Sequence, residues 1–94
     1  MNLEDKVSIP AQVMAREVGG ETVILNLESG IYFGLDAVGA RIWQLLCEHK
    51  TLNEVCDAIV EMYDVTREDI ERDLLSLVEA LRAQKLIEIA QPRE

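Results

Sequence analysis

Alternating apolar residues in the first third of the chain predict β-strands, and apolar residues at helical spacing in the remainder predict helices. The change from one pattern to the other falls within residues 25–46, LNLESGIYFGLDAVGARIWQLL. In this stretch a tight hairpin passes directly into an amphipathic helix. Because both carry an apolar face, we expect the hairpin and the helix to pack together, with the rest of the chain arranged around them.

Two glycine-containing turns predict three antiparallel strands in sequential order. Residues 13–18 and 21–27 flank Gly19-Gly20, and a two-residue hairpin turn needs the positive φ angles that glycine accepts. A second hairpin follows at once, so we expect the middle of the sheet at 23–25, the most continuously apolar part. The third strand then forms an edge of the sheet.

The second turn, Glu28-Ser29-Gly30, suits a type I turn closed by a glycine bulge, which sets the strand pairing. We expect Leu27 to stand opposite Ile31. Leu25 would then face Phe33. Because side chains alternate along a strand, these four would share one apolar face. The residues expected on the opposite face are Asn26 and Tyr32.

Three helices are predicted after the hairpins, each from a capping residue followed by an apolar stripe. The first runs from Ala37 to about Glu48 and buries Trp43, the only tryptophan. The second begins with a capping box, and the third is the longest. A short final strand is expected at 86–89. The three capping residues are Asp36, Thr51 and Thr66.

These elements predict an α+β fold: a small winged helix-turn-helix domain in which a three-stranded antiparallel β meander is followed by three helices and a short C-terminal strand. The 94 residues are enough for one modest core, so a single domain should span 1–94. Both ends, 1–10 and 90–94, are rich in polar residues, and we expect them to be loose arms.

The net charge of −9 makes nucleic acid and anionic membranes poor partners, because both favour cationic surfaces. The predicted third helix holds five acids and three bases over residues 67–82, whereas a helix that reads DNA needs the opposite balance. No apolar run approaches the roughly 20 residues of a membrane span, and the N-terminus lacks the features of a signal peptide. We therefore expect a cytoplasmic protein.

No residue pattern indicates catalysis, a cofactor or a metal site. His49 is the only histidine, and it falls at a helix end among polar residues. Cys47 and Cys56 lie beside apolar positions, so we expect two buried thiols, and their spacing from His49 is not that of a zinc site. The glycines form neither a phosphate-binding loop nor a nucleotide fingerprint. We expect no enzymatic activity.

The predicted third strand offers a surface for binding. Ile31, Tyr32 and Phe33 carry no charge, and such an edge exposes backbone groups with which a guest strand can pair. The apolar stripe of the third helix would supply side-chain contacts. In the alternatives, another part of the chain covers this edge, or a second copy of the protein pairs with it. The stripe consists of Leu74, Leu77, Val78 and Leu81, of which we expect at least two to belong to the core.

Four segments share their order and spacing with a known family. They are VILNLESGIYFGLD (23–36), GARIWQLL (39–46), TLNEV (51–55) and the helix ending in LRAQKL (81–86). In these segments the chain resembles the PqqD family, and the resemblance covers nearly the whole chain, from about Ala11 to Ile89. The family includes the chaperone of pyrroloquinoline quinone (PQQ) biosynthesis and stand-alone recognition elements for ribosomally made, modified peptides. The segments YFGLD and IW resemble the stand-alone lasso-peptide type more than the quinone type.

The resemblance implies a winged-helix domain that binds the leader peptide of a precursor as an added strand, between the third strand and the third helix, and presents it to a modifying enzyme. That partner would be a radical SAM enzyme, or a lasso-type protease or cyclase. Lys85 departs from the family, where glycine is frequent at this helix end, and a lysine there should strain the helix cap. By position, the implied peptide-binding residues are Ile31, Tyr32, Phe33, Asp73, Leu74, Leu77, Val78 and Leu81.

Two other functions are compatible with the sequence. A winged-helix domain can be a transcription regulator that binds DNA, and an open sheet edge can join two copies into a homodimer. A regulator would show a salt-sensitive affinity for DNA, whereas an adaptor would bind a peptide through backbone pairing and apolar side chains.

Overall fold

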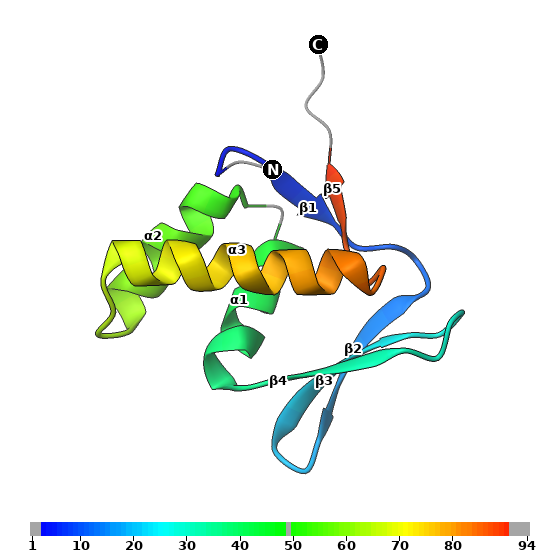
Figure 1. The fold of residues 1–94 in the computed structure, drawn as a ribbon. Coiled ribbons are helices and arrows are strands. Elements are labelled where there is room, and N and C mark those ends of the chain that lie inside the picture. Colours follow the sequence, from blue (N-terminus) through cyan, green and yellow to red (C-terminus); the bar gives the residue numbers. More distant parts are fainter. Residues whose placement is uncertain (1–2, 49, 91–94) are drawn as a thin grey trace.

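The computed structural model describes residues 3–48 and 50–90 and places the predicted elements in the expected order, with one additional strand before them (Figure 1). The predicted α+β class, with a three-stranded antiparallel meander, three helices and a C-terminal strand, is confirmed. The elements are β1 (Lys6–Ser8), β2 (Val13–Val18), β3 (Glu21–Asn26), β4 (Tyr32–Leu35), α1 (Ala37–Cys47), α2 (Leu52–Met62), α3 (Arg67–Ala83) and β5 (Glu88–Ala90).

Two small sheets and three helices make up the fold. Strands β2, β3 and β4 form one antiparallel sheet in that order, so β4 is an edge strand as predicted, and β1 pairs with β5 in a second sheet. In Figure 1, α3 lies across α1, and β4 passes below α3 before the chain enters α1. Residues of the edge strand and of the longest helix line a common groove, so these two elements lie beside each other.

The turn between β2 and β3 has the predicted geometry. Val18 pairs with Glu21, and the two residues between them, Gly19 and Gly20, have φ angles of 60° and 86°. Both angles lie in the left-handed region, as a type I′ turn requires. This tight turn sets the register of β2 and β3 along their whole length.

The pairing of β3 with β4 differs from the prediction by one residue. Leu25 pairs with Tyr32 rather than with Phe33. A shift of one residue exchanges the two faces of a strand. Asn26, which was expected to face away from the core, is therefore only 3% exposed, while Leu27, which was expected to face inward, is 61% exposed.

The side chain of Asn26 explains this register. Its Oδ1 accepts hydrogen bonds from the backbone N–H of Glu28, at 2.8 Å, and of Ser29, at 3.1 Å. Its Nδ2 donates to the carbonyl oxygen of Lys85 at 3.2 Å. A buried amide is stable only with such partners, and the partner at Lys85 lies on the inner side of the sheet. Asn26 therefore faces inward, shapes the turn and joins it to the end of α3.

Each helix begins at the predicted capping residue. Asp36 and Thr66 each accept a hydrogen bond from the backbone N–H three residues further on. Thr51 and Glu54 form the predicted capping box, in which each side chain accepts a hydrogen bond from the other residue's backbone N–H. The bond from the backbone of Thr51 favours the ionised carboxylate, so it holds the pKa of Glu54 below its ordinary value.

α3 ends in a Schellman motif that has a lysine where glycine is usual. The N–H of Leu86 donates to the carbonyl oxygen of Leu81 at 2.9 Å, and the N–H of Lys85 donates to that of Arg82 at 3.0 Å. Lys85 has a φ angle of 62° and is the one non-glycine residue with positive φ in the described part of the chain. A side chain in this region is disfavoured by about 1 kcal/mol or more. The strain expected from the sequence is therefore present at this cap.

Replacing Lys85 with glycine should raise the free energy of unfolding by about 1 kcal/mol, because glycine adopts a positive φ without steric cost. Denaturation in urea measures this change. Gln84→Gly is the matched control, since Gln84 has a φ of −89°. Glycine there should instead cost up to about 1 kcal/mol. A Lys85→Gly variant no more stable than the unaltered protein would show that the cap is not strained.

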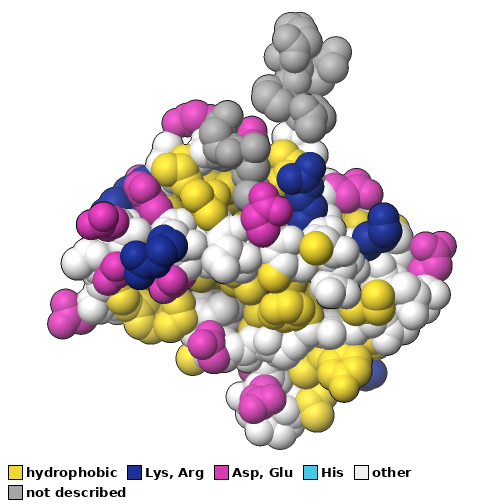
Figure 2. Space-filling view, viewed as in Figure 1, with side chains coloured by type: hydrophobic (Ala, Val, Ile, Leu, Met, Phe, Trp, Pro, Cys, Tyr) yellow, Lys and Arg dark blue, Asp and Glu magenta, His cyan; other side chains and the backbone are white. Residues whose placement is uncertain are grey.

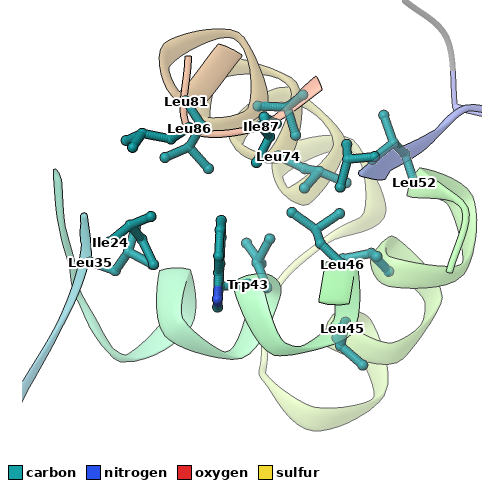
Figure 3. Packing of buried hydrophobic residues seen from close by; sticks show 14 of the residues in the cluster. Ile24, Leu35, Trp43, Leu45, Leu46, Leu52, Leu74, Leu81, Leu86 and Ile87 are labelled. Atoms are coloured by element: carbon teal, nitrogen blue, oxygen red, sulfur yellow. The ribbon is translucent and has the colours of Figure 1, made fainter. Parts of the chain in front are cut away.

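The core lies between the inner face of the three-stranded sheet and the helices. Trp43 is buried at its centre, as predicted, with Ile24 and Leu35 on the sheet side and Leu46 further along α1 (Figure 3). The side chains that cover this layer from α3 and from the segment after it are Leu74, Leu81, Leu86 and Ile87.

The N-terminal segment is not a loose arm, contrary to the prediction. Its strand β1 pairs with β5, and Val7 of β1 is buried in the core. The N–H of Leu52 donates to the carbonyl oxygen of Asp5 at 2.9 Å, which joins this segment to the start of α2. At the other end Ala90 belongs to β5, and residues 91–94 lie outside the described part.

Candidate functional site

A groove with a volume of about 560 Å³ lies between β4 and α3 and is completed by the first turns of α1. Figure 2, in the same view as Figure 1, shows hydrophobic side chains exposed between α3 and β4. Apolar residues from all three elements line most of the groove. The lining residues are Phe33, Gly34, Leu35, Asp36, Val38, Gly39, Ile42, Val65, Ile70, Asp73, Ser76, Leu77 and Ala80.

The free edge of β4 presents backbone groups from alternate residues. In an antiparallel pair, residues that bond to the neighbouring strand alternate with residues whose N–H and C=O point away from it. The N–H of Asn26 donates to the carbonyl oxygen of Ile31 at 2.9 Å, so the odd-numbered residues of this segment bond to β3. Tyr32 and Gly34 then direct their backbone groups toward the open edge. No described strand pairs with that edge.

The three predicted strand residues lie at the edge but face different surroundings. Phe33 is half-buried and lines the groove. Tyr32 is 72% exposed and stands on the outer face of the sheet, because it alternates with Phe33. Ile31 immediately precedes β4 and is also exposed. Phe33 therefore faces the groove and Tyr32 faces solvent, while Ile31, paired with the inward-facing Asn26, lies on the same face as Phe33 but does not line the groove.

The predicted residues of α3 divide between the groove and the core. Asp73 and Leu77 line the groove, and Leu77 is half-buried. Leu74, Val78 and Leu81 are each 0% exposed and pack in the core. The expectation that at least two of the four apolar residues would be core is confirmed. The three buried residues do not line the groove, so Leu77 is the apolar residue of this stripe that a ligand can reach.

The start of α3 is fixed to α2 by Arg67. Its guanidinium donates hydrogen bonds to Glu71, at 2.8 Å, and to Asn53, at 2.6 Å, and forms an ion pair with Asp57. The bonds to Glu71 and Asp57 stabilise the cation and raise the pKa of Arg67. An exposed ion pair alone contributes little, but several partners on two helices restrain their relative position. One wall of the groove is therefore anchored before a ligand arrives.

The groove is apolar with an acidic margin. Two of its described lining residues are charged, Asp36 and Asp73, and both are acids. One oxygen of Asp36 accepts the capping hydrogen bond of α1 at 2.8 Å, and Asp73 lies 4.0 Å from the guanidinium of Arg72. Such a surface suits apolar side chains and disfavours acidic ones.

The cysteines provide no obvious nucleophile. Cys56 is buried, but Cys47 is exposed at the last position of α1, so the prediction of two buried thiols is wrong for Cys47. Loss of hydration raises the pKa of both thiols, and the neighbouring carboxylate of Glu48 adds to the effect at Cys47. Within residues 3–48 and 50–90, no group of three or more metal-ligating side chains could hold a metal ion. His49 lies outside the described residues.

The contribution of α1 to the groove was not predicted from the sequence. Val38, Gly39 and Ile42 all line it, because β4 passes into α1 with Asp36 as the one intervening residue. A Cβ atom on Gly39 would lie 3.2 Å from Oδ1 of Asp36 and 3.3 Å from a methyl group of Leu35. Glycine at this position therefore lets α1 begin close against the strand. The direct passage from the strand into the helix was the feature of the sequence from which this contribution of α1 could have been predicted.

A family match covers the elements that form this groove. Residues 21–87 match the family described as Coenzyme PQQ synthesis protein D (PqqD). The chain belongs to the PqqD family. The matched part of this PqqD-family chain begins at β3 and includes β4 and all three helices, so the resemblance noted in the sequence is confirmed.

Two solved structures resemble this PqqD-family protein over most of its length. One is described as TbiB1 in complex with the TbiA(beta) leader peptide; it is 46% identical, with a TM-score of 0.78, over 85% of this chain and 93% of that chain. The other is described as lasso peptide synthetase B1 complexed with the leader peptide; it is 26% identical, with a TM-score of 0.77, over 93% of this chain and 99% of that chain. No curated protein matches the sequence of this chain. Among the described residues, no helix is long and apolar enough to cross a membrane.

Proposed function

We propose that this protein is a peptide-binding adaptor that takes up the leader of a ribosomally made precursor peptide as an added β-strand. The observation that carries the proposal is the unpaired edge of β4 beside the apolar groove of α3. An extended peptide gains affinity there from backbone hydrogen bonds and specificity from side chains that enter the groove. The two similar structures, both complexes with leader peptides, support this assignment.

In the proposed complex, the guest strand pairs with the outward backbone groups of Tyr32 and Gly34. Every second guest side chain enters the groove and packs between Phe33 and Leu77. Asp73 faces the guest from α3 and repels acidic side chains. Ile31 extends the contact beyond the end of the strand. The buried Leu74, Val78 and Leu81 act indirectly, because they hold α3 in place.

The adaptor presents the bound leader to a modifying enzyme and performs no chemistry itself. The similarity to lasso peptide synthetase B1 favours a lasso-type protease or cyclase over a radical SAM enzyme as that partner. The whole chain, 1–94, acts as a single domain in the cytoplasm, without a cofactor. A homodimer formed through two β4 edges would compete with leader binding, because the same backbone groups would be used.

Fluorescence anisotropy with labelled TbiA(beta) leader peptide tests the proposal against DNA binding. This leader is the appropriate probe because a 46% identical protein binds it. We expect saturable binding that changes little between low and high salt, and no binding of duplex DNA. DNA affinity that falls steeply with salt, without any leader binding, would instead identify a transcription regulator.

A further inference from the structure

Gly34 has no structural explanation within the fold. It lies inside β4, where glycine is less favourable than other residues by about 0.5–1 kcal/mol. Its φ angle is not positive, and a Cβ atom built on it meets nothing within 4 Å. By contrast, Gly19, Gly20 and Gly30 have positive φ angles, which favour glycine. At Gly39 a side chain would come too close to Asp36 and Leu35. A strand glycine without an internal reason often marks a place where a ligand or another backbone approaches closely.

The absence of a side chain at Gly34 leaves open space on the outer face of the sheet, which is called the Gly34 slot below. Gly34 pairs with Val23, so the half-buried side chain of Val23 lies next to this space on the same face. Tyr32, two residues earlier on the same face, forms one side of the slot and is 72% exposed. Leu25 pairs with Tyr32 and extends the apolar surface. The slot adjoins the groove across the backbone of β4, because Gly34 also lines the groove.

We propose that this slot receives a large apolar or aromatic side chain from the guest residue paired with Gly34. The inference rests on the proposed strand addition, which places that side chain on the outer face of the sheet, beside Tyr32. An aromatic ring laid across a cross-strand glycine covers its exposed backbone, and it would also reach Val23. Side chains on both faces of the bound leader strand are then recognised, those on one face by the groove and one on the other face by the Gly34 slot.

Gly34→Val fills the slot and should leave the domain folded, since a Cβ atom there has open space and valine is favoured in strands. Arg16→Val is the matched control. Arg16 lies in the same cross-strand row, paired with Val23 from the other side, but on the far edge of the sheet. Thermal unfolding should show no loss of stability for Gly34→Val.

A display library of random linear peptides is selected separately on the unaltered protein, on Gly34→Val and on Arg16→Val. The unaltered protein and Arg16→Val should enrich peptides that share one Phe, Tyr, Trp or other large apolar position. Alanine at that position should weaken binding to the unaltered protein about tenfold, and binding to Gly34→Val less than about twofold.

Three results would overturn the inference in distinguishable ways. If the unaltered protein enriches no peptide, the proposed function fails and the slot fails with it. If Gly34→Val enriches the same peptides with the same affinities, leader binding stands but the slot is not used. If Gly34→Val weakens every peptide equally, including those with alanine at the shared position, Gly34 serves backbone approach rather than side-chain recognition.

Discussion

Replacing Tyr32 with proline should weaken leader binding by at least about 30-fold and leave the domain folded. Proline has no N–H, and the register of β4 places the N–H of Tyr32 on the open edge rather than toward β3. The variant loses one backbone hydrogen bond and leaves a carbonyl of the guest unpaired, a loss of about 2–4 kcal/mol or about 30- to 1000-fold in affinity. Anisotropy with the TbiA(beta) leader measures the affinity, and circular dichroism reports the fold.

Tyr32→Val is the control for this variant, because it removes the same aromatic ring but keeps the backbone donor. We expect Tyr32→Val to bind more tightly than Tyr32→Pro by at least about tenfold. Equal affinities of the two variants would attribute the loss to the ring alone. Unfolding of Tyr32→Pro would show that the N–H of Tyr32 forms a hydrogen bond within the sheet, so that this edge of β4 is not available to a guest strand.

Replacing Leu77 with aspartate weakens leader binding by about 3 kcal/mol, or about 100-fold, with little effect on folding. Leu77 is half-buried and lines the groove, so an aspartate there removes apolar contact area and places an unpaired carboxylate against the guest. It would also lie in a groove that already contains Asp36 and Asp73. Titration calorimetry with the same leader gives the affinity.

Leu75→Asp is the matched control, because Leu75 is also half-buried on α3 but does not line the groove. Both variants should show similarly small losses of stability in urea, while Leu75→Asp keeps its affinity for the leader. A Leu77→Asp protein that unfolds would place Leu77 in the core with its three neighbours. Equal loss of affinity in both variants would mean that the effect comes from the helix as a whole.

Local signals predicted most of the fold. Capping residues at Asp36, Thr51 and Thr66 located the helix starts, and Gly19-Gly20 located the first hairpin, because each depends on a few consecutive residues. The pairing of β1 with β5 joins residues at opposite ends of the chain. No local pattern specifies such a contact, which is why the N-terminal segment was expected to be loose.

The β3–β4 register and the groove depended on tertiary contacts. A pattern of leucines favoured Leu25 and Leu27 as inward-facing, but Asn26 takes the inner face through its hydrogen bond to the carbonyl of Lys85, 59 residues away. Similarly, periodicity gave the apolar stripe of α3 without showing that Leu77 alone among its four residues borders the groove. The edge strand and every element except β1 were predictable, whereas the face that each residue presents required the packed structure.

An NMR titration of the ¹⁵N-labelled protein with the TbiA(beta) leader tests the central claim most directly. We predict that amide shifts are largest in two segments, 30–35 and 70–81, which form the edge strand and the facing side of α3. Amides of β2 on the far edge of the sheet should move little. A leader that binds without shifting the 30–35 amides, or that shifts mainly β2, would contradict strand addition at β4.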